Sequence, residues 1–191
     1  MTKKYKNKEK GFTLIELMVA TSIFSMVMLA SLGALFTLLG ASKNSRATHT
    51  AMDNVNFALE SMTRSIRMGS KYYCVPGRQG LPESLTQGKN CIVTPGTAIS
   101  FLPQGADPKP VSYKLASNNN GKTIERCKEQ DCVQVISDAV DVKELSFYVA
   151  GAGAGDEAEQ PRVFIKLKGE VKVKEEIIPF FIQTFISQRN Y

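Results

Sequence analysis

Residues 12–42 read FTLIELMVATSIFSMVMLASLGALFTLLGAS, and residues 1–11 before them read MTKKYKNKEKG. From Leu17 to Ser42 the chain has no charged residue. As a helix this stretch rises about 39 Å, more than the roughly 30 Å of a bilayer's hydrocarbon core. The apolar core of an ordinary signal peptide is shorter, about 7 to 15 residues. The stretch therefore predicts a membrane-spanning helix.

The excess positive charge of the chain is concentrated before this helix. Residues 1–11 hold five lysines and one acid, Glu9, which leaves 19 basic and 17 acidic side chains in residues 12–191. The formal net charge of +6 is therefore weak evidence for nucleic-acid binding. A lysine-rich flank also predicts that residues 1–11 lie on the cytoplasmic side of the membrane.

Glu16 lies near the start of the apolar stretch, where an unpaired charge costs about 2.5 to 3.5 kcal/mol on insertion scales. Over residues 10–20 the sequence KGFTLIELMVA resembles the amino-terminal signature of type IV prepilins and pseudopilins. The resemblance implies that a prepilin peptidase cuts between Gly11 and Phe12 and methylates the new amine of Phe12. It also implies that Glu16 docks against the terminal amine of a neighbouring subunit. The alternative is a plain signal anchor whose carboxylate snorkels to the headgroups.

The next segment, residues 43–69, predicts an amphipathic continuation of the helix. It has no proline, its first glycine is Gly69, and its apolar residues recur at helical spacing. These residues are Ala51, Val55, Ala58, Leu59, Met62 and Ile66. We expect one helix of about 55 residues, with residues 12–42 as its membrane or filament half. A coiled coil is the alternative for residues 43–69.

Residues 70–191 predict a β-rich head. Residues 70–96 contain several prolines and glycines and are expected to form a loop. Short runs with strand character follow it. They are 97–102, 111–116, 122–126, 132–136, 144–150, 162–168, 170–174 and 177–187. The expected fold is α+β and pilin-like, with the long helix packed on a carboxy-terminal antiparallel sheet.

A second resemblance covers residues 111–190, through SYKLA, GKTIERC, CVQVISDAVDVKELSFYV and FFIQTFISQRN. This part is similar to larger minor pilins and to the J-type pseudopilins of type II secretion. It implies a structural subunit that helps to initiate or cap a type IV pilus or pseudopilus. The partners implied are the prepilin peptidase, other pilins or pseudopilins and an inner-membrane assembly platform. The location implied is the bacterial inner membrane, with the head exported, and then the filament.

We expect the four cysteines to form disulfides, because an exported head lies in an oxidising compartment. They are Cys74, Cys91, Cys127 and Cys132. We expect the pairs Cys127–Cys132, which closes a hairpin turn, and Cys74–Cys91, which ties the long loop. The alternative is a zinc site, although the cysteines lack the short paired spacings that zinc usually uses.

No motif indicates an enzyme or a cofactor. The single histidine, His49, is expected on the exposed side of the helix and outside the head, which disfavours a catalytic triad. Two binding alternatives remain for the head. Calcium is one, through Asp138, Asp141 and Glu144. DNA is the other, through a basic face of two adjacent strands formed by Lys166, Lys168, Lys172 and Lys174. The competing class of function is a binding or enzymatic module on an uncleaved anchor, such as a DNA-uptake or adhesion tip subunit.

Overall fold

The computed structural model describes residues 11–77, 80–105, 109–118, 121–153, 159–173 and 176–189. The chain divides into two compact units, Met1–Ser45 and Arg46–Tyr191. One helix, α1 (Leu14–Arg67), begins in the first unit and ends in the second. Its length of 54 residues confirms the prediction of one long helix.

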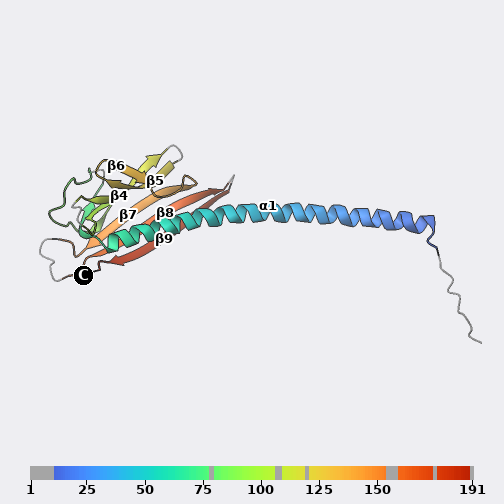
Figure 1. Cartoon of the computed structure of the whole chain (residues 1–191), viewed down its shortest axis with the longest axis horizontal. Coiled ribbons are helices and arrows are strands. Elements are labelled where there is room, and N and C mark those ends of the chain that lie inside the picture. The colour runs from blue at the N-terminus through green and yellow to red at the C-terminus, as the bar shows by residue number, and fades with distance from the viewer. Residues whose placement is uncertain are drawn as a thin grey trace, which may run out of the picture. The chain divides into compact units, whose positions relative to one another are not determined.

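Among the described residues of the second unit, nine strands follow α1. Figure 1 shows the strands as arrows and labels several of them. The strands are β1 (Ser70–Val75), β2 (Cys91–Gly96), β3 (Ala98–Leu102), β4 (Val111–Asn118), β5 (Gly121–Lys128), β6 (Asp131–Gln134), β7 (Val140–Ala150), β8 (Arg162–Val173) and β9 (Glu176–Ser187). They form a five-stranded sheet, β1-β3-β4-β5-β6, and a four-stranded sheet, β2-β7-β8-β9. The paired strands are antiparallel in both sheets. The predicted α+β, pilin-like architecture is therefore confirmed, although the head has two sheets instead of one.

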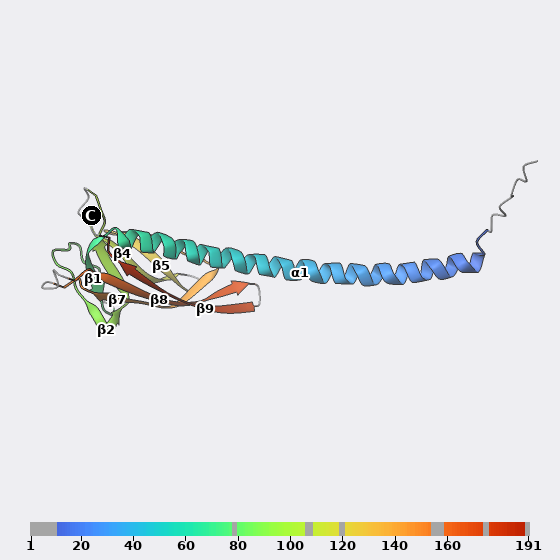
Figure 2. The same cartoon turned by 90° about the horizontal axis from the view of Figure 1, so that it is seen from below.

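The core of the second unit lies between the two sheets and the last turns of α1. Val55, Met62 and Ile66 project from one face of the helix and are at most 1% exposed. They belong to one buried cluster with residues of both sheets, such as Phe101 and Phe147. The views in Figures 1 and 2 show this part of α1 beside the strands. The apolar stripe predicted for residues 43–69 is thus the core-facing side of the helix.

The prediction that residues 70–96 form a loop is wrong, because this region contains β1 and β2. β1 pairs with β3, and β2 pairs with β7 at Cys91↔Val149 and Gly96↔Phe147. Glycine and proline correctly indicated chain turns here. The glycine and proline residues do not indicate which distant strands pair with β1 and β2.

The predicted break between residues 162–168 and 170–174 is also wrong, because β8 continues through Gly169 to Val173. A Cβ atom at Gly169 would lie 2.6 Å from Cζ of Phe180, on the neighbouring strand. Gly169 therefore makes room for an aromatic ring and does not mark a turn.

Candidate functional site

The first described residues, Gly11, Phe12 and Thr13, precede the first turn of α1. The carbonyl oxygen of Thr13 accepts hydrogen bonds from the backbone N–H groups of Glu16, at 3.1 Å, and Leu17, at 3.2 Å. Oγ1 of Thr13 accepts a longer bond from the N–H of Glu16, at 3.4 Å. Thr13 is therefore the amino-terminal cap of the helix, and Glu16 occupies the third helical position.

Capping by Thr13 explains part of the amino-terminal signature. Threonine followed three residues later by glutamate is the pattern of a capping box. A carboxylate in the first turn also interacts favourably with the positive end of the helix dipole. Sequence reasoning missed the role of Thr13, although the Thr-Leu-Ile-Glu spacing carried the signal.

Every large apolar side chain from Phe12 to Leu39 is exposed, and Phe12 itself is 77% exposed. An apolar surface of this extent indicates a membrane or a protein interface, because soluble monomers rarely expose so large a patch. By length and composition α1 can cross a membrane. Glu16 is also exposed, so its carboxylate would enter a membrane or a protein interface together with this apolar surface.

Five hydroxyl groups within this apolar segment donate to helix carbonyl groups. The pairs are Thr21 to Met18, Ser22 to Val19, Ser25 to Thr21, Ser31 to Val27 and Thr37 to Gly33, at 2.8 to 3.1 Å. A polar group without a partner is costly in hydrocarbon, and these bonds remove that cost. The segment is thus compatible with a lipid or filament interior along its length, apart from the charge of Glu16.

A family model described as the prokaryotic N-terminal methylation motif matches residues 6–32. The chain carries a prokaryotic prepilin-type methylation motif. The match covers the start of α1, including Gly11, Phe12, Thr13 and Glu16. The motif and the α+β fold together are those of a type IV pilin-like protein. No curated protein and no solved structure matches the chain significantly.

Both disulfides lie in the head, in the pairs expected. Cys74–Cys91 connects β1 to β2 and therefore joins the five-stranded sheet to the four-stranded sheet. Its role differs from the loop tie that was expected, because both cysteines lie in strands. Cys127–Cys132 joins directly opposed residues of β5 and β6.

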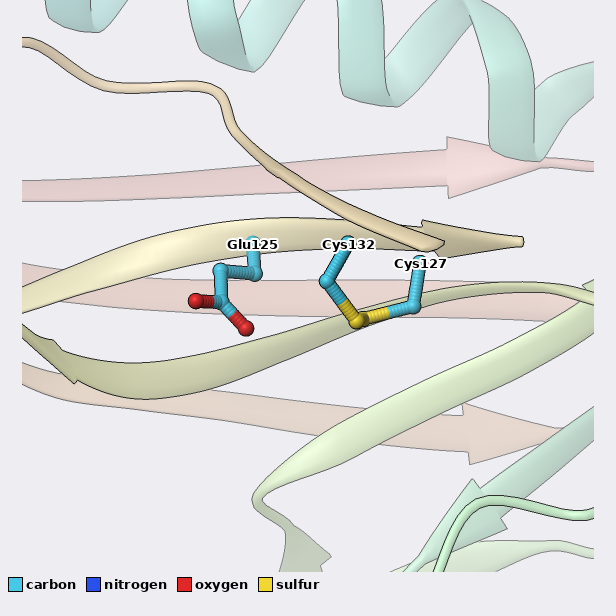
Figure 3. A group of neighbouring side chains, drawn as sticks. All are labelled: Glu125, Cys127 and Cys132. Carbon is cyan, nitrogen blue, oxygen red and sulfur yellow. A yellow bond between two sulfur atoms is a disulfide. The ribbon is translucent and has the colours of Figure 1, made fainter. Parts of the chain in front are cut away.

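Among the described residues, one group of possible metal ligands lies close together: Glu125, Cys127 and Cys132 (Figure 3). The two sulfur atoms are bonded to each other, so neither is a thiolate. Glu125 forms an ion pair with Lys114, at 3.2 Å. The group is therefore a disulfide-bonded hairpin with an ion pair on its surface.

The calcium alternative named three carboxylates, and the structure gives each of them separate partners. Asp138 accepts hydrogen bonds from Asn118 and Gln134, while Glu144 pairs with Lys166 and Lys168. Within the described residues they are not gathered as a cluster of ligands.

Asp141, the third carboxylate, is held by Lys143 Nζ at 2.8 Å and by the backbone N–H of Lys122 at 2.9 Å. These hydrogen bonds lower the pKa of Asp141, and that from Lys143 contributes most. A Cβ at Gly121, whose φ is 144°, would lie 2.4 Å from Oδ1 of Asp141, so glycine is needed there. Asp141 thus fastens the β4–β5 hairpin to β7.

The predicted basic face lies on one strand instead of two, with Lys166, Lys168 and Lys172 at alternate positions of β8. Lys174 lies outside the described residues. Salt bridges to Glu144, at 2.8 Å from Lys166 and 3.2 Å from Lys168, occupy two of these lysines. The same bonds lower the pKa of Glu144. The face is therefore a ladder of ion pairs, which reduces its attraction for phosphate groups.

Aromatic side chains share this face of the sheet. Tyr148 and Phe164 are cross-strand partners with ring centroids 5.8 Å apart, and Phe164 lies opposite Phe185. Nζ of Lys168 lies 5.6 Å from the ring centroid of Phe181. The face is richer in aromatic groups than the sequence indicated, and β9 contributes its most exposed members.

Proposed function

We propose that this chain is a minor pilin or pseudopilin, a structural subunit that helps to initiate or cap a type IV pilus or a type II secretion pseudopilus. The observation that carries the proposal is the methylation motif at residues 6–32, placed at the start of a helix whose large apolar side chains are all exposed from Phe12 to Leu39. The fold of the second unit supports it, since the helix packs on antiparallel sheets as in a pilin.

In this proposal the chain enters the bacterial inner membrane with residues 1–11 in the cytoplasm and the head exported. Prepilin peptidase cuts between Gly11 and Phe12 and methylates the amine of Phe12. Residues 12–42 then anchor the subunit until the assembly platform adds it to other pilins or pseudopilins. Two disulfides in the head agree with an oxidising compartment.

Glu16 is proposed as the docking residue. Its carboxylate meets the terminal amine of a neighbouring subunit, and the two charges leave water together. Such a pair is strong in low dielectric, and an unpaired partner there is costly. Assembly is therefore favoured only when both groups are in place.

The minor role is supported by the likeness of residues 111–190 to minor pilins and J-type pseudopilins and by the size of the head. The head contains two sheets and two disulfides, and it is a large part of a subunit of 191 residues.

Amino-terminal sequencing and intact mass of the chain from producing cells test the proposal. The expected product begins at Phe12 and carries one added methyl group. Gly11→Val is the matched variant, because a Cβ at Gly11 meets no atom within 4 Å and so leaves the fold of the chain undisturbed. We expect this variant to keep residues 1–11, since the peptidase must accommodate position 11. An intact Met1 in the wild-type chain would instead indicate a module on an uncleaved anchor.

A further inference from the structure

One row of aromatic side chains crosses the four-stranded sheet to its β9 edge. Tyr148 on β7 lies opposite Phe164 on β8, and Phe164 lies opposite Phe185 on β9. Directly opposed residues of antiparallel strands share one face of the sheet, so the three side chains form a continuous row. The row reaches the free edge of β9 at Phe185.

β2, the other edge strand of this sheet, meets the row at its opposite end. The first and last residues of β2 pair with the two neighbours of Tyr148, so Ile92–Pro95 form a bulge opposite Tyr148. Within the bulge, Ile92 is 64% exposed and Val93 is 92% exposed. The apolar row therefore extends from the β2 bulge across the sheet to Phe185.

The two ends of the row are open apolar surface. Phe185 is 59% exposed, and Phe181, farther along the same face of β9, is 51% exposed. Neither edge carries a charge there, because residues 91–96 read CIVTPG and residues 177–187 read IIPFFIQTFIS. Charged side chains are a usual protection of sheet edges against other chains. Association would remove both uncharged ends from water.

The direction of each strand decides which edges of two copies can meet in one membrane. β9 ends where α1 ends, because the N–H of Arg189 donates to the carbonyl oxygen of Arg67 at 3.0 Å. Figures 1 and 2 show β9 alongside this part of α1, so the strand and the helix run in the same direction. Two β9 edges paired antiparallel would therefore point their helices in opposite directions, which excludes that pairing for copies anchored in one membrane.

β2 runs opposite to β9, because three antiparallel pairings separate the two strands in the sheet. When two heads stand side by side in the same orientation, β9 of one head faces β2 of the next. The two ends of the row lie at the same height along the strands, since direct cross-strand pairs connect them. Side-by-side heads therefore bring the β2 bulge of one copy next to Phe185 of the other.

We propose that the heads of two copies of this chain associate edge to edge, with the β2 bulge of one copy packed on the exposed phenylalanine side chains of β9 in the next. Side chains make this contact, because a bulge opposes a hydrogen-bonded ladder with a further strand. The contact joins different surfaces of the two copies, so each pair keeps one free β2 edge and one free β9 edge. Such a heterologous contact can repeat into a row of copies.

The size of the surface indicates a weak contact that depends on local concentration. Two half-exposed phenylalanine side chains offer about 200 Å² of apolar area on the β9 edge. A stable interface buries about 800 Å² on each side. Anchoring in one membrane raises the effective concentration of the heads, so this step rests on the membrane anchoring in the proposed function.

Photo-crosslinking of the full chain in the membranes of producing cells tests the contact. Benzoylphenylalanine at position 185 is expected to give a dimer whose crosslink maps to residues 91–96 of the second copy. The same probe at position 93 should give a crosslink to β9. Val133 is the matched control, because it is 60% exposed on β6, an edge strand of the other sheet. We expect no dimer from a probe at that position.

Two complementary variants test whether the contact joins opposite edges. Val93→Asp disables the β2 edge and is measured with the probe at 185, whereas Phe185→Asp disables the β9 edge and is measured with the probe at 93. Each should lower the dimer yield about tenfold or more, because association would bury a carboxylate against apolar side chains. Protease resistance of the head and the absence of free thiols verify that each variant folds.

Co-production of the two variants with different affinity tags should restore the crosslink. The Val93→Asp copy, with the probe at 185, keeps an intact β9 edge, and the Phe185→Asp copy keeps an intact β2 edge. These two intact edges can still meet, so the expected product is a mixed dimer at a yield close to that of the wild type.

Four outcomes overturn the proposal: no dimer from position 185, a crosslink from 185 only to β9 or to a different protein, an equal dimer yield from position 133, or no mixed dimer from the co-produced variants. Sequencing the amino terminus of the same samples separates this proposal from the proposed function. A chain that begins at Phe12 and gives no dimer refutes the edge contact alone. A chain that keeps Met1 refutes the processing, and the crosslink result still decides the contact.

Discussion

The hydroxyl group of Tyr72 lies 2.7 Å from the carbonyl oxygen of Ile66 and 2.8 Å from that of Gly69. Ile66 lies in the last turn of α1, where carbonyl groups lack donors within the helix, and Gly69 follows two residues after the helix ends. Tyr72 is 1% exposed, and its burial raises the pKa of the hydroxyl, which therefore remains a donor. The first strand of the head thus caps the helix that precedes it.

Tyr72→Phe removes this cap while keeping the ring. We expect the free energy of unfolding to fall by about 0.5 to 1.5 kcal/mol, because one buried hydrogen bond is lost. The carbonyl oxygen of Ile66 keeps the N–H of Gly69 as a donor, and that of Gly69 keeps Nε2 of Gln188. Thermal unfolding of the full chain in mild detergent, followed by near-ultraviolet circular dichroism, measures the change. Tyr148→Phe, on the partly exposed outer face of β7, is the matched control. An equal loss in both variants would contradict the capping role.

The two disulfides should contribute unequally to stability. Loss of Cys74–Cys91, with a sequence separation of 17, should cost about 3 kcal/mol in the chain-entropy model. Loss of Cys127–Cys132, with a separation of 5, should cost about 2 kcal/mol. Paired Cys→Ser variants compared by urea unfolding measure both. Because Cys74–Cys91 also joins the two sheets, its removal should increase proteolysis between residues 76 and 90, whereas removal of the other should not.

Local sequence patterns predicted the long helix and the cysteine pairs. The elements that these patterns missed depend on pairing between strands that are far apart in the sequence. The stripe from Ala51 to Ile66 lies within one helix, so its period is visible in the sequence. The position of β2 depends on β7, some fifty residues later, and only two of its residues pair there. No local feature of residues 91–96 indicates that partner.

The candidate site divides in the same way. Gly11, Phe12 and Glu16 were predicted from a short signature. The Thr-Leu-Ile-Glu spacing within that signature could also have predicted that Thr13 caps the helix. The exposure of the aromatic side chains Phe181 and Phe185 on β9 was not predicted. An alternation of apolar residues does not show which strand ends up at the edge of a sheet.

Asp141→Asn should reveal a pH-dependent contribution to folding. The pKa of Asp141 is lowered in the folded chain, so its charge stabilises the fold above the unfolded pKa of about 3.9. That contribution is lost as the pH falls through the lower, folded value. Wild type should therefore unfold at higher urea than the variant near neutral pH, and the two should converge below about pH 4. Asp53→Asn, on the exposed side of α1, gives the background, and a constant difference across this range would contradict the assignment.

Two substitutions at Glu16 separate the two roles proposed for it, capping the helix and pairing with an amine. Glu16→Gln keeps a side chain that a capping box accepts but removes the charge, whereas Glu16→Ala removes both. If charge pairing drives docking, both variants should be lost from filaments or tip complexes to a similar extent, at least tenfold for a loss of about 1.4 kcal/mol. Pull-down of assembled material, normalised to processed chain in the membrane, measures the loss. If Glu16→Gln were recovered like wild type and only Glu16→Ala were lost, Glu16 would act through the helix start alone, and the electrostatic docking proposed here would be wrong.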